Sequence, residues 1–294
     1  MTRNPNPKKQ GFIIIFQFWY SQQGEAQDPK IFALGSSSRS PTPAFLAKTS
    51  VATNRMDASP EIIINRPLGQ FIKNDHLKPM AQRYVRVQAT DGHIYYGLLQ
   101  LGRQVKVLDA PPWLKGEPTD LELTADSYRL LSPCAPSKIV AVGKNYTEHA
   151  AEMGTPVPQE PLLFLKPPSA VIAVEAEIQY PPQSQRVDYE GELALVIGDR
   201  CVNCTPEQAH SKIWGYTIGN DVTARDLQKS DGQWTRAKGF DTFCPLGPWI
   251  VREIGPSARL QTFLNDQTEP VQSAFISQMV FPPDVLVAYI SQVM

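Results

Sequence analysis

The sequence predicts a mostly β fold with a few helices, an α+β chain whose regular structure lies along residues 80–294. Three observations predict it: short strand-like segments recur after Met80, turn residues separate many of them, and helical patterns are few and short. Hydrophobic residues make up 42% of the chain and charged residues 19%, which is ordinary for a protein with a packed core. This composition excludes a fully disordered chain.

Residues 1–79 lack the pattern of a folded domain. They carry ten Lys or Arg against five Asp or Glu, and residues 35–60 are rich in Ser, Thr, Pro and Ala without a steady period. Phe12–Phe16 is a short apolar segment within this region. We expect residues 1–79 to be poorly ordered, or to be an artefactual extension if translation starts at Met80.

A small β module is predicted over residues 80–132. Tyr84–Thr90 alternates in polarity, Asp91-Gly92 is a tight-turn pair, and Ile94–Leu99 is the returning strand of a hairpin. A third strand, Val105–Leu108, follows a Gly-Arg turn. These strands define a first, small domain.

Residues 133–294 predict a larger domain of strands with interspersed helices. The expected strands are Lys138–Val142, Leu162–Leu165, Leu193–Ile197, Trp214–Asn220 and Gln261–Leu264. Helical patterns cover Thr147–Met153 and the segment after Thr205, which begins with a capping Thr, a Pro and a Gln three residues after the cap. The larger domain is therefore expected to be mostly β as well.

A last helix is predicted after Pro283. Its apolar residues have the spacing of one buried helix face: Val285, Leu286, Tyr289, Ile290 and Val293. A helix that faces a core normally leads into an element that it packs against, and the sequence stops at Met294. We therefore expect the larger domain to be truncated at its C-terminus.

The charge and the cysteine content disfavour several classes of protein. A net charge of −1 gives no overall field to attract nucleic acid, and no apolar run reaches the ~18 residues of a membrane helix. Four cysteines are too few for a disulfide framework, so a cytoplasmic protein is expected. Cys201 and Cys204 have the spacing of a redox pair or half a zinc ribbon, but no second pair exists, and we interpret them as incidental.

Two glutamates at the start of an apolar strand are the strongest local feature. Glu190 and Glu192 flank Gly191, so their side chains point to the same side of the strand. Like charges there repel unless a cation lies between them. An isolated Glu-x-Glu is more often a solvated strand edge, but the apolar run that follows indicates burial and favours a metal. Asp221 follows the strand at 214–220 and offers a third ligand, although it could equally be a turn residue. Three carboxylates suit Mg²⁺ or Mn²⁺.

A histidine and a glutamate form a candidate proton-transfer pair. His149 and Glu152 are three residues apart in a helical pattern and so share a helix face. Glu152 would orient the imidazole and allow it to take a proton from water. On spacing alone, an exposed His beside a Glu on a surface helix is the better interpretation.

Three cations are candidates for binding a substrate that carries a carboxylate. Lys166 lies at the end of an apolar strand, where a lysine without a function would be unusual. Arg225 and Lys238 flank an irregular stretch, Asp226–Gly239, that could fold over a pocket. A surface role stays open for each of the three.

Taken together, these stretches resemble the fumarylacetoacetate hydrolase family over about residues 133–294. The ordered succession of motifs is more specific than any one of them. The module at residues 80–132 resembles the small N-terminal domain of one branch of the family. The motifs are Val140–His149, Phe164–Pro167, Asp188–Leu193, Asn220–Asp226, Ala237–Asp241 and Pro245–Pro248.

The resemblance implies a β-sandwich or roll that holds Mg²⁺ or Mn²⁺ through Glu190, Glu192 and Asp221. It also implies a catalytic His149–Glu152 dyad on a mobile lid, and a homodimer. A metal that chelates the carboxylate and 2-oxo oxygens of a substrate would stabilise an enolate. The residues that the resemblance places around the pocket are Lys166, Arg225, Gln228 and the catalytic Lys238.

The activity expected first is metal-dependent hydrolysis of a C–C bond in acylpyruvate-type 2,4-dioxo acids. The alternative on the same scaffold is a decarboxylase or tautomerase of oxaloacetate-like or 2-hydroxydienedioate substrates. A third hypothesis is an inactive, truncated metal-binding remnant, because the family continues past the last helix with a Gly-Asp strand and a Thr-Gly-Thr-Pro-type loop. In the first two cases the partner is a small 2-oxo acid, and neither nucleic acid nor a membrane is expected.

Overall fold

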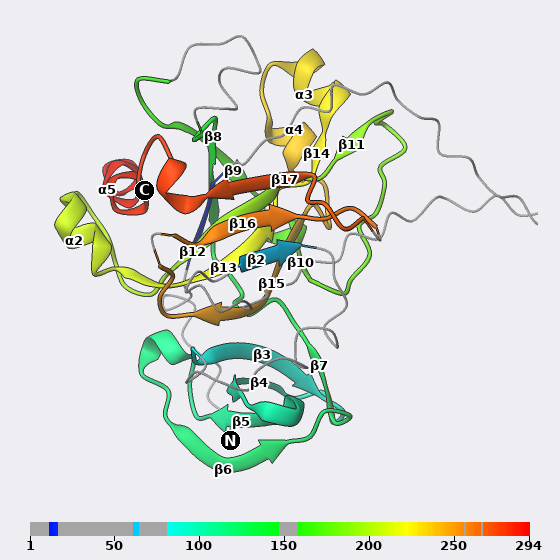
Figure 1. Ribbon diagram of the computed structural model, residues 1–294, viewed down its shortest axis with the longest axis vertical. Helices are drawn as coiled ribbons and strands as arrows, with labels where there is room; N and C mark the ends of the chain where they lie inside the picture. The colour runs from blue at the N-terminus through cyan, green and yellow to red at the C-terminus, as the bar shows by residue number, and fades with distance from the viewer. Residues whose placement is uncertain (1–11, 17–60, 65–80, 147–157, 256, 266) are drawn as a thin grey trace, which may run out of the picture.

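The computed structural model describes residues 12–16, 61–64, 81–146, 158–255, 257–265 and 267–294 (Figure 1). Strands dominate there, and the mostly β class with a few helices is confirmed. The largest sheet has twelve strands, ten of them in the order β6-β5-β4-β3-β15-β13-β12-β1-β8-β9. The remaining two strands, β7 and β10, pair with β3 and β15.

The predicted small module forms the lower lobe in Figure 1. Its antiparallel strands are β3 (Arg83–Ala89), β4 (Ile94–Leu99), β5 (Val105–Leu108), β6 (Pro118–Leu123) and β7 (Tyr128–Leu130). The predicted hairpin turn is present, and Gly92 adopts there a φ of 87° that a residue with a side chain rarely takes. Val85, Val87 and Val105 fill its core together with Trp249 from the larger domain.

The central strands of the larger domain continue the same sheet. They are β8 (Ile139–Gly143), β9 (Leu162–Lys166), β10 (Val171–Ala173), β12 (Gly191–Ile197), β13 (Ile213–Asn220) and β15 (Cys244–Val251). The pairing of Ile250 with Tyr84 joins this part of the sheet to the small module. All seven residues of β12 are buried, as expected for a strand covered on both faces.

Two segments from the region predicted to be poorly ordered pair with the larger domain. β1 (Phe12–Phe16) lies between β12, to which it is antiparallel, and β8, to which it is parallel. Ile13 and Ile14 of this strand are completely buried. β2 (Glu61–Ile64) pairs in parallel with β16 (Arg259–Thr262). The rest of residues 1–79 lies outside the described residues.

Smaller sheets and short helices cover the central strands. β16 also pairs with β17 (Gln272–Phe275), so the predicted strand at 261–264 in fact lies two residues earlier. β11 (Val187–Asp188) pairs with β14 (Thr223–Ala224). The stretch that we predicted to be irregular contains two helices, α3 (Arg225–Asp231) and α4 (Thr235–Lys238).

Two further helices, α2 and α5, pack against each other at the left of Figure 1. α2 (Pro206–His210) begins at Thr205 with the predicted capping box, which is confirmed. In α5 (Pro283–Ser291) the buried apolar residues are Leu286, Val287, Ala288 and Ile290. The predicted face was wrong at its ends, because Val285 and Val293 are exposed. The helix predicted at 147–153 lies outside the described residues.

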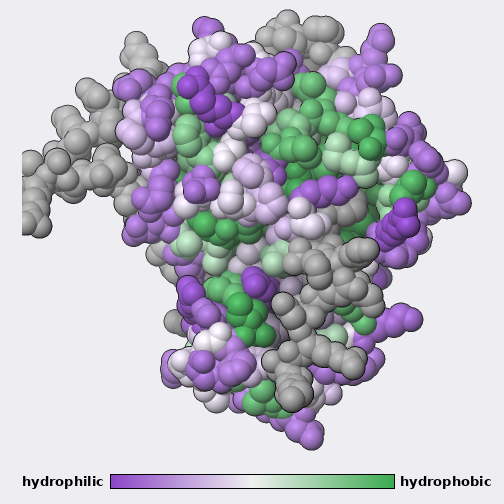
Figure 2. Space-filling model, turned by 180° about the vertical axis from the view of Figure 1, so that it is seen from behind, coloured by the Kyte–Doolittle hydropathy of each residue, from purple (hydrophilic) through white to green (hydrophobic). Residues whose placement is uncertain are grey.

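Short 3-10 turns connect several of these elements. They are η3 (Leu101–Arg103), η4 (Pro112–Leu114), η5 (Pro168–Ala170) and η6 (Ile276–Gln278). Among the helices that the structure describes, none has the length and apolarity needed to cross a membrane. On the surface, Leu162 and Leu165 of the edge strand β9 are exposed, and Figure 2 shows hydrophobic side chains gathered in patches on the face seen from behind. Such patches mark contact surfaces, and the homodimer stays a prediction.

A buried carboxylate–lysine cluster as the candidate active site

The register between β12 and β13 brings two of the predicted carboxylates together. Gly191 pairs with Asn220, so Glu190 and Asp221 lie opposite each other just beyond the paired strand ends. The Asp221 amide donates to the Glu190 carbonyl oxygen at 2.8 Å, and the Glu190 amide donates to Oδ1 of Asn220 at 3.0 Å. Both carboxylates are completely buried. The backbone therefore fixes their separation before any ligand binds.

Two buried lysines neutralise these carboxylates. Nζ of Lys238, at the end of α4, donates to Oε2 of Glu190 at 2.7 Å, to Oδ2 of Asp221 at 2.6 Å and to the Thr223 hydroxyl at 2.9 Å. Nζ of Lys166, at the end of β9, donates to Oδ1 of Asp221 at 2.6 Å and to the Lys238 carbonyl oxygen at 2.6 Å. Two cations and two anions thus form one closed hydrogen-bonded network, in which each lysine has its donors satisfied.

Neighbouring opposite charges keep two buried groups of this network ionised despite their burial. Burial raises the pKa of Glu190, but the Lys238 ammonium and the Arg225 guanidinium outweigh it, so that this pKa is lowered. Burial lowers the pKa of Lys238, and the charges of Asp221 and Glu190 outweigh it and raise that pKa. Glu190 and Lys238 are therefore both ionised at neutral pH.

Arg225 links the buried network to the surface. Its Nη2 donates to Oε1 of Glu190 at 2.5 Å, its Nε to Asp188 at 2.9 Å, and its Nη1 to Oε1 of Gln228 at 2.7 Å. The Arg225 side chain is 16% exposed, whereas both lysines are closed off from solvent. Of the predicted cations, Arg225 is therefore the one that a molecule in solution meets first, and Gln228 orients it.

Aromatic rings close one side of the network. Phe164 of β9 and Trp234 before α4 meet edge to face, with ring centroids 5.2 Å apart. Nζ of Lys238 lies 4.9 Å from the centroid of Phe164 and 5.8 Å from that of Trp234. A cation near an aromatic face is stabilised electrostatically, and the rings lower the local dielectric constant. These rings hold the Lys238 ammonium in place.

Glu192, the third predicted ligand, is also completely buried. It lies two residues after Glu190, on the same side of the strand. Its charge acts on Tyr146: burial raises the pKa of the Tyr146 phenol, and the charge of Glu192 raises it further. Glu190 and Asp221 thus share the Lys238 ammonium, and the charge of Glu192 acts on the Tyr146 phenol.

The structure adds two positioning residues that the sequence did not reveal. Oε1 of Gln272, from β17, accepts a hydrogen bond from the Gly191 amide at 3.0 Å and so fixes the backbone between the two glutamates. The Asn220 side chain holds the Glu190 amide, as described above. Asn220 was detectable, because it directly precedes Asp221. Gln272 lies far away in sequence, and no local signal marks it.

The structure does not describe the predicted dyad, and it bears only in part on the predicted metal site. His149 and Glu152 lie outside the described residues. Among the residues that the structure describes, no three His, Cys, Asp or Glu side chains are grouped to hold a metal ion. The donor chemistry nevertheless fits Mg²⁺ or Mn²⁺, because Glu190 and Asp221 are buried oxygen donors that already converge on one cation. In the structure that cation is the Lys238 ammonium.

Two family profiles match the chain in the order that the sequence indicated. The profile described as fumarylacetoacetate (FAA) hydrolase C-terminal matches residues 138–294. The profile described as Rv2993c-like, N-terminal matches residues 82–133. The candidate cluster lies wholly within the first of these matches.

Curated relatives and a solved structure agree with these matches. The chain is 46% identical over 205 residues to an uncharacterised protein of Archaeoglobus fulgidus, covering 69% of this chain and 77% of that protein. It is 42% identical over 161 residues to a human mitochondrial oxaloacetate tautomerase, covering 53% of this chain and about half (51%) of that protein. A crystal structure of 5-carboxymethyl-2-hydroxymuconate delta-isomerase from Mycobacterium smegmatis superposes with a TM-score of 0.64 at 40% identity, covering 72% of this chain and 83% of the other.

Proposed function

This chain belongs to the fumarylacetoacetate hydrolase family, and on that premise we propose that it is an isomerase that tautomerises a small 2-oxo dicarboxylate or its enol. The single observation that carries the proposal is the hydrogen-bonded cluster of Glu190, Asp221 and Lys238, buried yet linked to the surface through Arg225. The relatives named as a tautomerase and an isomerase support the same reaction class. Both names describe an isomerisation, in which no atom is gained or lost.

Tautomerisation needs a base that accepts a proton from the carbon next to the 2-oxo group, and a cation that stabilises the negative charge developing on the oxo oxygen. The buried ion network provides the second of these. A preorganised cation in a low-dielectric site stabilises that charge, because no solvent has to reorganise during the reaction. We assign this role to the positive charge of Lys238, which acts through its electrostatic field, because its three N–H donors are already taken by Glu190, Asp221 and Thr223.

Binding of the substrate would begin at Arg225. Its guanidinium is the partly exposed cation of the network, and Gln228 holds one of its nitrogens. A guanidinium binds a carboxylate through two parallel hydrogen bonds, which would fix the orientation of a dicarboxylate. Lys166 would act by holding Asp221, and by adding positive charge beside Lys238.

A divalent metal fits this proposal as a further cation. Glu190, Glu192 and Asp221 would hold Mg²⁺ or Mn²⁺, which supplies Lewis-acid polarisation of the 2-oxo and carboxylate oxygens when bound. Glu190 and Asp221 are the donors that support it, because they share one cation already. The chain's own residues account for binding, orientation and the positioning of Lys238.

Hydrolysis of a C–C bond, the activity first expected from the sequence, has weaker support. It needs a water molecule activated by the His149–Glu152 dyad, which lies outside the described residues. The human relative is named as a tautomerase and the Mycobacterium smegmatis structure as an isomerase, and isomerisation requires no water. The relatives therefore favour the alternative over the hydrolase.

The test compares the two reactions on one preparation. The enol form of oxaloacetate is mixed with the protein and Mg²⁺, and the decay of its ultraviolet absorbance is followed beside the spontaneous rate. Cleavage of an acylpyruvate is measured in parallel. We expect accelerated decay of the enol, lost in Lys238→Met, and no cleavage. Acylpyruvate cleavage without any acceleration of the enol decay would refute the isomerase.

A further inference from the structure

Two cysteines outside the candidate active site have their sulfur atoms close together. Sγ of Cys201 and Sγ of Cys204 are 2.9 Å apart, in the loop that connects β12 to α2. Cys201 is buried, whereas Cys204 is partly exposed. From the sequence alone we interpreted this pair as incidental, because no second pair accompanies it. The contact between the sulfur atoms gives the pair a chemistry of its own.

We propose that Cys201 and Cys204 are a thiol–disulfide modification site, which a low-molecular-weight disulfide converts to an intramolecular Cys201–Cys204 disulfide. A disulfide bond is about 2.0 Å long, so the sulfur atoms have to approach by only about 0.9 Å. This site is separate from the proposed function, because neither cysteine contacts the Glu190 cluster.

The backbone around the pair is already held in a turned conformation. The Asn203 amide donates to the Ser291 carbonyl oxygen at 2.9 Å, and the Cys204 amide donates to the Ser291 hydroxyl at 2.9 Å. Asn203 itself adopts a φ of 49°, the left-handed conformation that Asn tolerates better than most residues. Both hydrogen bonds go to Ser291, the last residue of α5. Formation of the disulfide therefore requires little rearrangement of the loop. Because these hydrogen bonds already order the backbone, the disulfide costs little further conformational entropy.

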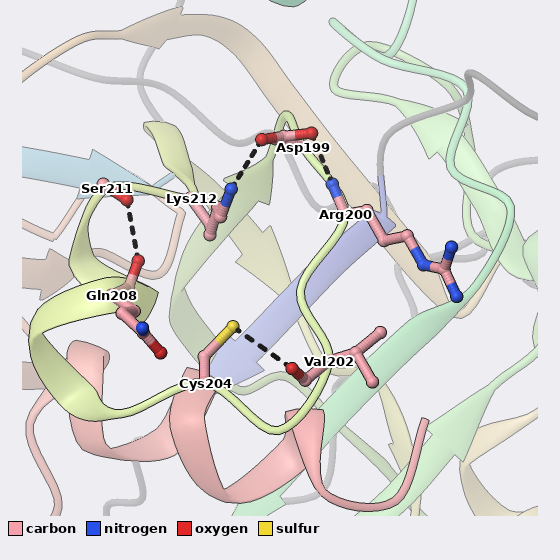
Figure 3. Close-up of a pocket in the computed structure, with 7 residues that line it drawn as sticks. All are labelled: Asp199, Arg200, Val202, Cys204, Gln208, Ser211 and Lys212. Carbon is pink, nitrogen blue, oxygen red and sulfur yellow. Dashed lines mark hydrogen bonds and ion pairs between the residues drawn. The ribbon is translucent and has the colours of Figure 1, made fainter.

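The surroundings of Cys204 suit an anionic disulfide. Cys204, Arg200 and Lys212 are among the residues that line an open hollow of about 590 Å³, and Figure 3 draws their side chains. Asp199 pairs with Lys212 at 2.6 Å, which leaves the hollow with one more cation than anions. Glutathione disulfide, a peptide with several carboxylates, matches the charge of such a hollow.

The order of the two steps follows from burial. Cys201 is closed off from solvent, and burial and the neighbouring Cys204 together raise the pKa of its thiol to about 11. A thiol with a raised pKa is a poor nucleophile at neutral pH, because the thiolate is the reactive form. The disulfide from solution therefore reacts first with Cys204, and Cys201 acts as the resolving thiol.

The steps balance without another reagent. Cys204 loses its proton to solvent, and its sulfur attacks glutathione disulfide, which forms a mixed disulfide and releases one glutathione thiolate. Cys201 then loses its proton, and its sulfur attacks the Cys204 sulfur, which releases the second glutathione. Two protein thiols are oxidised to one disulfide, and one glutathione disulfide is reduced to two glutathione molecules.

The other two cysteines provide an internal control. Cys134 and Cys244 are almost completely buried, and burial raises the pKa of each thiol to about 12. They should stay reduced as long as the chain is folded. Treatment of the folded chain with glutathione disulfide at neutral pH should therefore lower the number of free thiols from four to two.

The experiment counts thiols and maps the linkage by mass spectrometry after alkylation and digestion. We expect a Cys201–Cys204 linkage in the unchanged chain, reversed by dithiothreitol. Cys201→Ser should retain one glutathione on Cys204, because the resolving thiol is missing. Cys204→Ser should retain none.

Three results would overturn the proposal. The first is a folded chain that keeps all four thiols, and the second is a stable glutathione adduct on Cys204 in the unchanged chain. The third is a glutathione adduct on Cys201 in Cys204→Ser, which would reverse the order of the steps. Because the thiol count of the unchanged chain decides the first two, the proposal is tested even if a serine variant folds poorly.

Discussion

Replacing Lys238 by Met tests the ion network most directly. Methionine fills much of the space of the lysine stem but removes the ammonium that donates to Glu190, Asp221 and Thr223. Two carboxylates then share a completely buried site with one positive partner fewer. Breaking a buried ion pair from one side costs about 3–5 kcal/mol, because the remaining charge is left uncompensated. We expect the free energy of unfolding to fall by that amount when a chelator is present.

Adding Mg²⁺ to the same variant tests the metal prediction separately. An ion that binds only the folded chain, at about 100 times its dissociation constant, stabilises it by about 2.7 kcal/mol. Because Glu190 and Asp221 lose their shared ammonium in this variant, Mg²⁺ should restore most of the lost stability. The readout is urea unfolding followed by tryptophan fluorescence, with and without the ion.

The control is Lys106→Met. Lys106 pairs with Glu122 at 3.0 Å on the surface of the small module, where the pair is partly exposed. A surface ion pair contributes at most about 1 kcal/mol, so this variant should unfold almost as the unchanged chain does. If Lys238→Met in chelator were no less stable than Lys106→Met, the stabilising role of the buried network would be refuted. If Mg²⁺ stabilised neither variant, the predicted metal site would be refuted.

Three further predictions concern β1, Glu190 and Arg225. Ile14→Ala should lower the free energy of unfolding in urea by about 2–5 kcal/mol, because Ile14 of β1 is completely buried. Ile94→Ala, at an exposed position, should lower it by less than about 0.5 kcal/mol, and equal effects would refute a central position for β1. The pKa of Glu190 is lowered on folding, so its contribution to stability is present above about pH 4.3 and is lost as the pH falls through the folded pKa. The stability difference between the unchanged chain and Glu190→Gln should therefore shrink below about pH 4, and a constant difference in pH-dependent unfolding would contradict the ion pair. Arg225→Gln should lower kcat/KM for a dicarboxylate about 10- to 100-fold, mainly through KM; an unchanged KM in the enol assay would remove Arg225 from binding.

Local sequence patterns predicted the elements whose contacts are local. The hairpin around Gly92 and the capping box at Thr205 depend on neighbouring residues, and the structure contains both. The approach of Glu190 to Asp221 was predictable because each residue borders an apolar strand. An alternating or apolar pattern identifies a strand but does not name its partner. For that reason the place of β1 between β12 and β8 could not be predicted.

Side chains that reach the site from distant elements were beyond prediction for the same reason. Gln272 lies in a segment with no catalytic pattern, and only the pairing of β16 with β17 brings it to Gly191. The irregular composition of residues 226–239 concealed α3 and α4, because helices of seven and four residues are too short to show a helical period. The tertiary contacts of Lys238, which ends α4, hold that segment in place.

The structure also qualifies the argument that pointed to a metal. Neighbouring carboxylates need a cation, and the sequence argument took that cation to be Mg²⁺ or Mn²⁺. Lys238 meets the same electrostatic need from within the chain, and Lys166 and Arg225 reinforce it. A metal entering the site would therefore compete with the Lys238 ammonium for carboxylates whose negative charge is already neutralised. Its affinity should accordingly be higher in Lys238→Met than in the unchanged chain, and calorimetric titration of both with Mg²⁺ measures that difference without reference to catalysis.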